Sequence, residues 1–270
     1  MRVLFNLMIV TLLATWLLAN LTAADQPVST QQGWGNLHGQ IIVRGNVPSI
    51  RNERIPSDLA ICLQGELGIK DDNLLVDPAG GLADVFVMLI PDDNQVKPSI
   101  HPSYQAIQGQ SVTLEFDNCR LQPHAILLQT GQELVLKNND DVGHHCQIDT
   151  FQNSGNLLVA RHSEYSFRFQ QPDRTPGTVK CGIHKWIDAL ILVKDHPYND
   201  ISQRDGCFEI NNIPPGKWKF MFWHSKTGYL DEMEVAGFEV SQQGEITAQI
   251  SAESTVQLGQ IIVPARVFKD

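Results

Sequence analysis

Short apolar runs recur along the chain, and glycine, proline, asparagine and aspartate separate them, whereas the spacing of an amphipathic helix is nearly absent. This pattern is typical of an all-β protein built as a sandwich or barrel. The apolar runs predict strands at His38–Val43, Val85–Ile90, Ser111–Asp117, Ala125–Gln129, Glu133–Lys137, His145–Asp149, Ser163–Phe169, Gly177–Cys181, Ala189–Lys194, Cys207–Ile210, Trp218–Trp223, Gly237–Ser241, Ile246–Ser251 and Gln257–Val263.

The first residues have the layout of a secretory signal peptide. One basic residue precedes an apolar run, which the small residues Thr22, Ala23 and Ala24 close. We therefore expect residues 1–24 to be removed on export, and the mature protein to be periplasmic or extracellular. An uncleaved signal anchor is the alternative, and the polar residues within the run favour cleavage. The rest of the chain contains no run long enough to span a membrane.

Acidic residues outnumber basic ones by 30 to 20, and no basic cluster interrupts them. Such a protein should repel nucleic acid and anionic lipid surfaces, whereas a basic partner, such as a small redox protein of the cytochrome kind, is electrostatically favoured. The nucleophile, zinc-protease, dinucleotide and P-loop motifs of common enzymes are absent from the sequence. We therefore expect a binding protein and not an enzyme.

The chain has five cysteines, and the odd count matters in an oxidising compartment. One cysteine is then either exposed to unwanted oxidation or committed to a metal, and Cys181 is our candidate for the committed one. The other four, Cys62, Cys119, Cys146 and Cys207, are enough for up to two disulfides. We favour Cys62 with Cys119, although connectivity does not follow from sequence.

Cys181 belongs to a set of three candidate metal ligands. The segment VKCGIHKW places it at the end of a predicted strand, with His184 three residues later in a tight loop. The segment LVLKNNDDVGHHCQI places His144 after an Asn-Asn pair and a short acidic turn. A site that transfers electrons through copper needs one thiolate and two imidazoles, which these three residues supply. The C-x-x-H pair alone is a weak signal, and the upstream histidine strengthens it.

Cys146 leaves a rival interpretation of the same residues open. Strand alternation puts residues 144 and 146 on one face and His145 on the other. Cys146 therefore lies either near the metal or in the interior as a small apolar residue, which is the commoner outcome. With one of the two adjacent histidines and with Cys181 and His184, it would complete a tetrahedral zinc site.

The segment around His144 resembles the first-ligand segment of plastocyanin-type cupredoxins. The wider chain is similar to exported bacterial cupredoxin-domain proteins that carry a carboxypeptidase-regulatory-like, or transthyretin-like, part. The resemblance implies a cupredoxin-like Greek-key β-sandwich with one type 1-like copper at His144, Cys181 and His184, acting in electron transfer. That group usually has an axial methionine where this chain has Ile187. Such a site would be three-coordinate with a raised reduction potential, or it would have lost copper.

The same resemblance implies the domain organisation. A turn, a strand, a Pro-Gly turn and a second strand follow one another in DGCFEINNIPPGKWKFMFWHSKTGY, as in a regulatory-like module. The segments GQIIVRGNVP and GGLADVFVMLIP fit the opening of such a module. We therefore expect its first half at 33–95, an inserted cupredoxin-like domain at 96–194, and its second half at 195–270.

Other aromatic and histidine residues fit structural roles better than ligand binding. We expect His124, His196 and His224 to pack and hydrogen-bond, and Trp186 to belong either to the core or to an apolar surface beside His184. The alternating residues Trp218, Phe220 and Phe222 resemble a sugar-stacking set but better fit a sandwich core. Two other functions remain open, namely a non-redox module that binds partner proteins or glycans, and copper storage or delivery.

Overall fold

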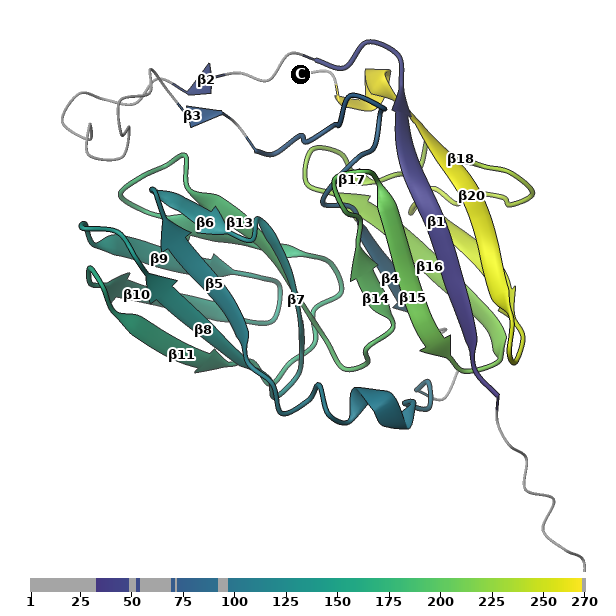
Figure 1. Ribbon diagram of the computed structural model, residues 1–270, viewed down its shortest axis with the longest axis horizontal. Coiled ribbons are helices and arrows are strands. Elements are labelled where there is room, and N and C mark those ends of the chain that lie inside the picture. The colour runs from purple at the N-terminus through teal and green to yellow at the C-terminus, as the bar shows by residue number, and fades with distance from the viewer. Residues whose placement is uncertain (1–32, 49–51, 54–68, 71, 92–96, 269–270) are drawn as a thin grey trace, which may run out of the picture. The chain divides into compact units, whose positions relative to one another are not determined.

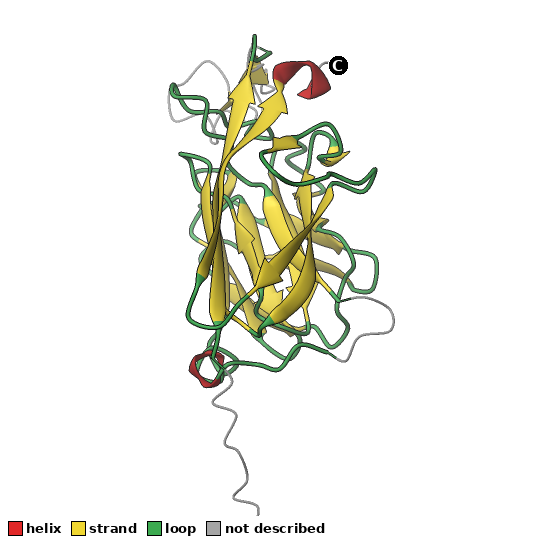
Figure 2. Cartoon of the chain, turned by 90° about the vertical axis from the view of Figure 1, so that its right-hand side faces the viewer, coloured by secondary structure: helices red, strands yellow, loops and turns green. Residues whose placement is uncertain are grey.

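The computed structural model describes residues 33–48, 52–53, 69–70, 72–91 and 97–268. Strands dominate these residues, whose only helices are two short 3-10 turns, Pro102–Tyr104 and Ala265–Phe268 (Figure 2). The expected all-β class is therefore confirmed. Within the described ranges, no helix is long and apolar enough to cross a membrane. The predicted signal peptide lies outside the described residues.

Residues 112–194 build two sheets that pack face to face, and we call this unit the first sandwich (Figure 1). Its strands are β5 (Val112–Asp117), β6 (Arg120–Gln122), β7 (Ala125–Gln129), β8 (Glu133–Asn138), β9 (His144–Asp149), β10 (Ser154–Val159), β11 (Glu164–Arg168), β12 (Gly177–Cys181) and β13 (Asp188–Lys194). One sheet has the order β10-β9-β12-β13-β7 and the other has the order β11-β8-β5-β6. Apolar residues from both sheets form one continuous core.

Strands from both sides of that segment build a second pair of sheets, the second sandwich. Its strands are β1 (Gly35–Arg44), β4 (Phe86–Ile90), β14 (Asn199–Ile201), β15 (Cys207–Ile213), β16 (Gly216–His224), β17 (Gly228–Tyr229), β18 (Glu234–Val235), β19 (Glu245–Ile250) and β20 (Thr255–Pro264). The sheet orders are β15-β1-β20-β18 and β14-β4-β16-β17, and β19 also pairs with β16. Two short strands, β2 (Asn52–Glu53) and β3 (Ile69–Lys70), pair with each other.

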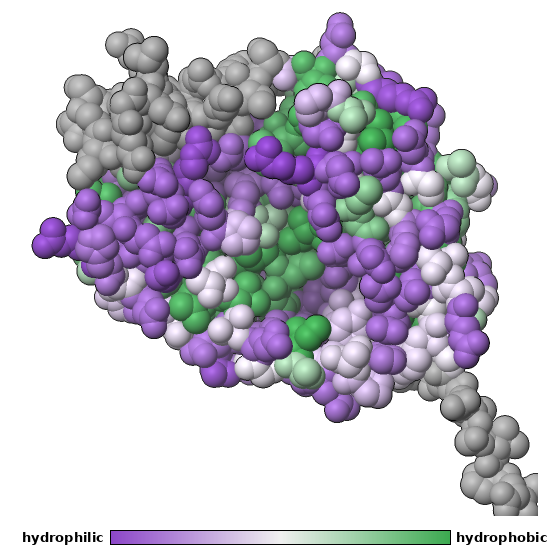
Figure 3. Space-filling model, in the orientation of Figure 1, coloured by the Kyte–Doolittle hydropathy of each residue, from purple (hydrophilic) through white to green (hydrophobic). Residues whose placement is uncertain are grey.

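Strand β13 explains why the run ALILV is apolar throughout. Ile191 and Val193 face the core of the first sandwich, whereas Leu190 and Leu192 belong to a separate cluster with residues of β4 and β16. A strand buried on both faces has no position for a polar residue, which produces a continuous apolar run instead of alternation. Strand β4 is likewise buried on both faces, whereas strands such as β8 and β9 alternate. Polar residues cover much of the face seen in Figure 3.

The structure differs from the strand predictions in both directions: one predicted strand is absent, and the predictions did not include β10 or the short strands β2, β3, β6, β14, β17 and β18. Residues 237–241 do not form the predicted strand, because the chain turns at Gly237, where φ is +80°, directly after the short strand β18. Strand β10 was not predicted. It is an edge strand that pairs only with β9, and its half-exposed SGNLLV sequence carries a weak strand signal.

The aromatic set and the cysteines can also be located. Trp218, Phe220 and Phe222 are buried in the core of the second sandwich, which confirms the core interpretation and removes the sugar-stacking one. Cys119 is disulfide-bonded, whereas its expected partner lies outside the described residues. Cys146, Cys181 and Cys207 are free thiols, so no second disulfide forms among the described cysteines.

Candidate metal centre

A buried asparagine shapes the turn that presents His144. Asn138 closes β8 and is 1% exposed. Its side-chain amide donates to the carbonyl of Val142 at 2.8 Å, and its side-chain oxygen accepts from the backbone N–H of Asp140 at 2.9 Å. These two bonds fold the acidic turn back on itself, so that His144 enters β9 as its first residue with an inward-pointing side chain.

The loop between β12 and β13 presents the other two residues. Cys181 ends β12, and its N–H donates to the carbonyl of Ile187 at 2.9 Å, while the N–H of Ile187 donates to the carbonyl of His184 at 3.0 Å. The loop is thus closed by its own backbone. A Cβ on Gly182 would lie 2.4 Å from a ring nitrogen of His145, so the close approach of loop and β9 requires glycine.

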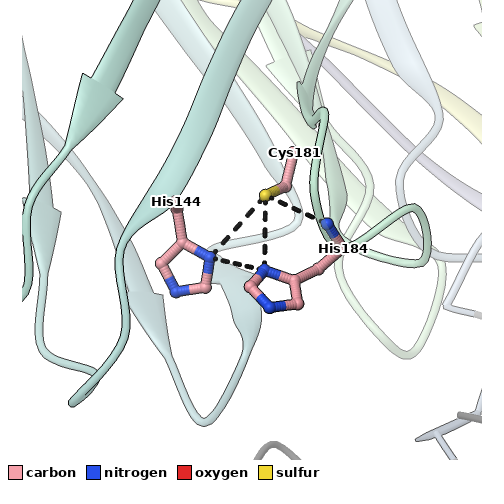
Figure 4. Close-up of side chains that lie close together, drawn as sticks. All are labelled: His144, Cys181 and His184. Carbon is pink, nitrogen blue, oxygen red and sulfur yellow. Dashed lines mark hydrogen bonds between the residues drawn. The ribbon is translucent and has the colours of Figure 1, made fainter. Parts of the chain in front are cut away.

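The three side chains converge on one point (Figure 4). The two Nδ1 atoms of His144 and His184 are 3.1 Å apart, and the sulfur of Cys181 lies 3.7 Å from the first and 3.5 Å from the second. The centre of a triangle with these sides lies about 2.0 Å from each corner, close to ordinary metal–nitrogen bonds and slightly short of metal–sulfur bonds. The donor atoms therefore fit a small metal ion in a trigonal plane.

Asp140 fixes which nitrogen of His144 is available. The Nε2 of His144 lies 2.8 Å from a carboxylate oxygen of Asp140, and the same oxygen accepts from the backbone N–H of Cys119 at 3.1 Å. A carboxylate can only accept, so Nε2 carries the proton and the neutral imidazole has its lone pair on Nδ1. This is the nitrogen that faces Cys181. The arrangement matches the carboxylate–histidine pairs that orient metal ligands in proteins.

Electrostatics favour a thiolate at Cys181. Burial opposes ionisation, but hydrogen bonds from the two histidine rings and from the His184 backbone outweigh it and lower the pKa of Cys181 to about 5. The bond from His144 requires that its ring be protonated on Nδ1 as well as Nε2, a proton that a metal would displace. For His144, burial alone would lower the pKa, yet the bonds to Asp140 and Cys181 raise it above its ordinary value. The site thus stabilises an ionised sulfur, which is the form that binds a metal.

The site is enclosed by aromatic rings. His144, Cys181 and His184 are 0%, 2% and 3% exposed. Phe116 stacks on the His144 ring with 4.3 Å between centroids, and Trp186 meets the His184 ring edge to face at 5.3 Å. Trp186 is half-buried and packs against the core, so it combines the two roles that the sequence left open.

The two residues that decide between rival sites lie nearby. Ile187 is 1% exposed and belongs to the same core cluster as Cys181, and its side chain offers no donor atom. Cys146 lies on the inner face, as strand alternation predicts, but its sulfur is not part of the convergent group. Burial, reinforced by the charge of Cys181, raises the pKa of Cys146 to about 12. A four-ligand zinc site is therefore not preformed here.

The remaining histidines lie away from this group. His124 makes a 2.7 Å contact from Nδ1 to a carboxylate oxygen of Asp84, and His145 points out of the sandwich toward Asn156. His196 and His224 each use Nδ1 locally, accepting from the backbone N–H two residues later. These contacts agree with the structural roles expected for His124, His196 and His224.

Sequence reasoning missed the roles of Asp140 and Phe116. The acidic turn was visible, but nothing in its spacing indicated which carboxylate faces the histidine. Asp140 also belongs to a second group of close side chains with Cys119 and His144. Because Cys119 is disulfide-bonded, its sulfur is no thiolate, so this second group lacks the thiolate that the first one has.

No family model matches the chain, and no curated protein matches it. Similar solved structures are cupredoxins. Amicyanin from Paracoccus versutus matches with 10% identity, covering 40% of this chain and 97% of its own, at a TM-score of 0.28. A purple cupredoxin from Nitrosopumilus maritimus matches with 16% identity, covering 31% of this chain and all of its own, at a TM-score of 0.27.

Proposed function

We propose that this protein binds one type 1-like copper ion through His144, Cys181 and His184 and transfers single electrons. The observation that carries the proposal is the convergence of two Nδ1 atoms and one sulfur around a point about 2.0 Å from each, in a buried site. Soft thiolate and imidazole together suit both oxidation states of copper. Copper supplies a centre that takes up and releases one electron.

The chain's own residues would keep this centre rigid. Two contacts hold the His144 ring in place: Asp140 accepts a hydrogen bond from its Nε2, and Phe116 stacks on its face. Cys181 and His184 sit on a loop that its own backbone bonds close. Ligands fixed before the metal arrives need little rearrangement when its charge changes, which favours fast electron transfer. The enclosing rings keep water away from the donor atoms.

The expected domain organisation, export and redox partner are part of the same proposal. We propose that residues 96–194 form a cupredoxin-like domain inserted into a regulatory-like module at 33–95 and 195–270, and that the protein is exported after removal of residues 1–24. The formal net charge of −10 favours a basic redox partner, such as a cytochrome. Ile187 in place of an axial methionine implies a three-coordinate site with a raised reduction potential.

The test is a visible and EPR spectrum of the exported protein titrated with Cu(II). We expect an intense thiolate-to-copper band and narrow copper hyperfine splitting at one copper per chain. Cys181→Ser should abolish both signals, whereas the matched control Cys146→Ala, which alters the neighbouring inward-facing thiol, should keep them. A colourless wild-type protein that retains no stoichiometric copper would refute the proposal and return attention to a non-redox binding role.

A further inference from the structure

Cys146 lies directly across the sheet from Cys181. Strands β9 and β12 are antiparallel, and their register pairs the Cα atoms of these two residues. Directly opposed residues in an antiparallel pair point to the same face of the sheet. Both thiols are accordingly buried in the core of the first sandwich, at 0% and 2% exposure, and both are free.

The hydrogen-bond pattern fixes how close the two backbones come. The N–H of Gly182 donates to the carbonyl of His145 at 2.8 Å, so these two residues form the hydrogen-bonded pair next to Cys146 and Cys181. The cysteines are therefore the non-hydrogen-bonded pair, whose Cα atoms typically lie about 4.5 Å apart. Disulfides span Cα separations of about 4.4–6.8 Å, so the backbone accommodates a bond between these two sulfurs.

We propose that Cys146 and Cys181 form a cross-strand disulfide when a peroxide reaches the metal-free protein, and that this bond shuts the metal site. The Cys181 sulfur attacks one peroxide oxygen, the O–O bond breaks, and the departing oxygen leaves as water after taking a proton. The Cys146 sulfur then attacks the oxidised Cys181 sulfur, the S–O bond breaks, and a second water carries away the remaining proton. Two thiols are oxidised and one peroxide is reduced to two waters.

The disulfide would prevent metal binding, because the Cys181 sulfur cannot bond to Cys146 and coordinate a metal at the same time. In the structure the Cys181 sulfur faces the two imidazoles. Disulfide formation therefore requires a rotation about its Cα–Cβ bond that turns the sulfur toward Cys146. A sulfur in a disulfide is no longer a thiolate ligand. Because both thiols are buried, only a small oxidant reaches them. The claim that the disulfide closes a copper site rests on the proposed function, whereas the disulfide itself does not.

Peptide mapping tests the proposal directly. Trypsin places Cys146 in peptide 138–161 and Cys181 in peptide 181–185, because Lys137, Arg161, Lys180 and Lys185 bound them. After the metal-free full chain is treated with hydrogen peroxide, we expect these two peptides to appear joined and lighter by two hydrogens than their sum. Copper uptake should fall in proportion to the joined fraction.

Two variants serve as controls. Cys207→Ala, which removes the other free thiol, should leave the joined peptide unchanged. Cys146→Ala should abolish the joined peptide and let peroxide carry Cys181 to its sulfinic form. Recovery of peptide 138–161 with a free thiol while Cys181 is oxidised or unreacted would overturn the proposal. A joined peptide in a protein that never binds copper would support the disulfide while refuting the electron-transfer function.

Discussion

The first sandwich and the remainder of the described chain each bury two histidines, but the pKa of His144 in the first shifts in the opposite direction from those of the two in the second. His144 and His184 are 0% and 3% exposed, and His196 and His224 are 4% and 1% exposed. Burial lowers the pKa of His196 and of His224 to about 4. The pKa of His144 is raised, because Asp140 and Cys181 outweigh the same effect. Burial alone therefore does not distinguish the candidate ligands.

The contacts of Nδ1 make the difference. In His196 and His224 this nitrogen accepts the backbone N–H of Tyr198 or Lys226, so its lone pair is already used within a local turn. In His144 the far nitrogen is bound to a carboxylate and Nδ1 faces a sulfur. A histidine becomes a ligand when its outer nitrogen is anchored and its inner one is left free beside other donors.

The largest effect expected from this comparison follows from removing one histidine of each kind. His184→Ala deletes a donor atom and should weaken copper binding by more than the roughly 100-fold that loss of an outer-shell partner can cause. His224→Ala deletes an equally buried ring but should leave copper affinity unchanged while lowering the free energy of unfolding. Competition with a chromophoric chelator measures the first quantity, and urea unfolding measures the second. Equal losses of copper affinity in the two variants would show that the two kinds of buried histidine do not differ as ligands.

The second effect concerns the anchor of His144. Asp140→Asn keeps the shape but removes the charge that faces Nε2, and it should lower Cu(II) affinity by about 10-fold to 100-fold and raise the reduction potential. Its sequence neighbour provides the matched control, because Asp141 is exposed and contacts His162 at the surface. Asp141→Asn should change neither quantity. Chelator competition measures the copper affinity of both variants, and redox titration measures their reduction potentials. An unchanged potential in Asp140→Asn would contradict the role assigned to Asp140.

Residues whose position depends on contacts nearby in sequence could be predicted, and those that depend on contacts distant in sequence were missed. His144, Cys181 and His184 could be predicted because strand alternation and a short loop fix their directions locally. Asp140 could not, since its side chain sits in a turn and depends on an N–H that lies 21 residues away in sequence. Strand β10 was missed for a related reason, because its only partner is β9 and its own sequence is weakly apolar.

A third effect tests the position of Ile187. Ile187→Met introduces a thioether of similar volume into the core and should cost less than about 1.5 kcal/mol of stability. If residue 187 lies on the axis of the site, the new donor should favour Cu(II) and lower the reduction potential. Ile148→Met makes the same exchange at a buried position of β9 in the same core and should leave the potential unchanged. Equal potentials in both variants would place residue 187 off the axis.

The last effect is a pH dependence of the metal-free protein. The pKa of Cys181 falls from 9.0 to about 5 on folding, because its imidazole hydrogen bonds outweigh burial. Its contribution to the free energy of unfolding is complete above pH 9.0 and is lost as the pH falls through about 5, since the unfolded chain binds the extra proton in between. His144, with its raised pKa, contributes in the opposite sense, being complete below 6.5 and lost as the pH rises through its folded value.

Comparison of variants separates the two contributions. Urea unfolding of the metal-free protein between pH 5 and pH 9 should show that Cys181→Ser loses the part of the stability that rises with pH. Cys146→Ala should keep the wild-type pH profile up to about pH 8, because the folded thiol, with a pKa of about 12, stays protonated and the unfolded thiol ionises only near 9.0. If Cys181→Ser keeps the wild-type profile too, the two inward-facing thiols are equivalent and the imidazoles do not hold a thiolate. The convergence of His144, Cys181 and His184 would then be a result of packing alone, without the negative charge on sulfur that metal binding requires.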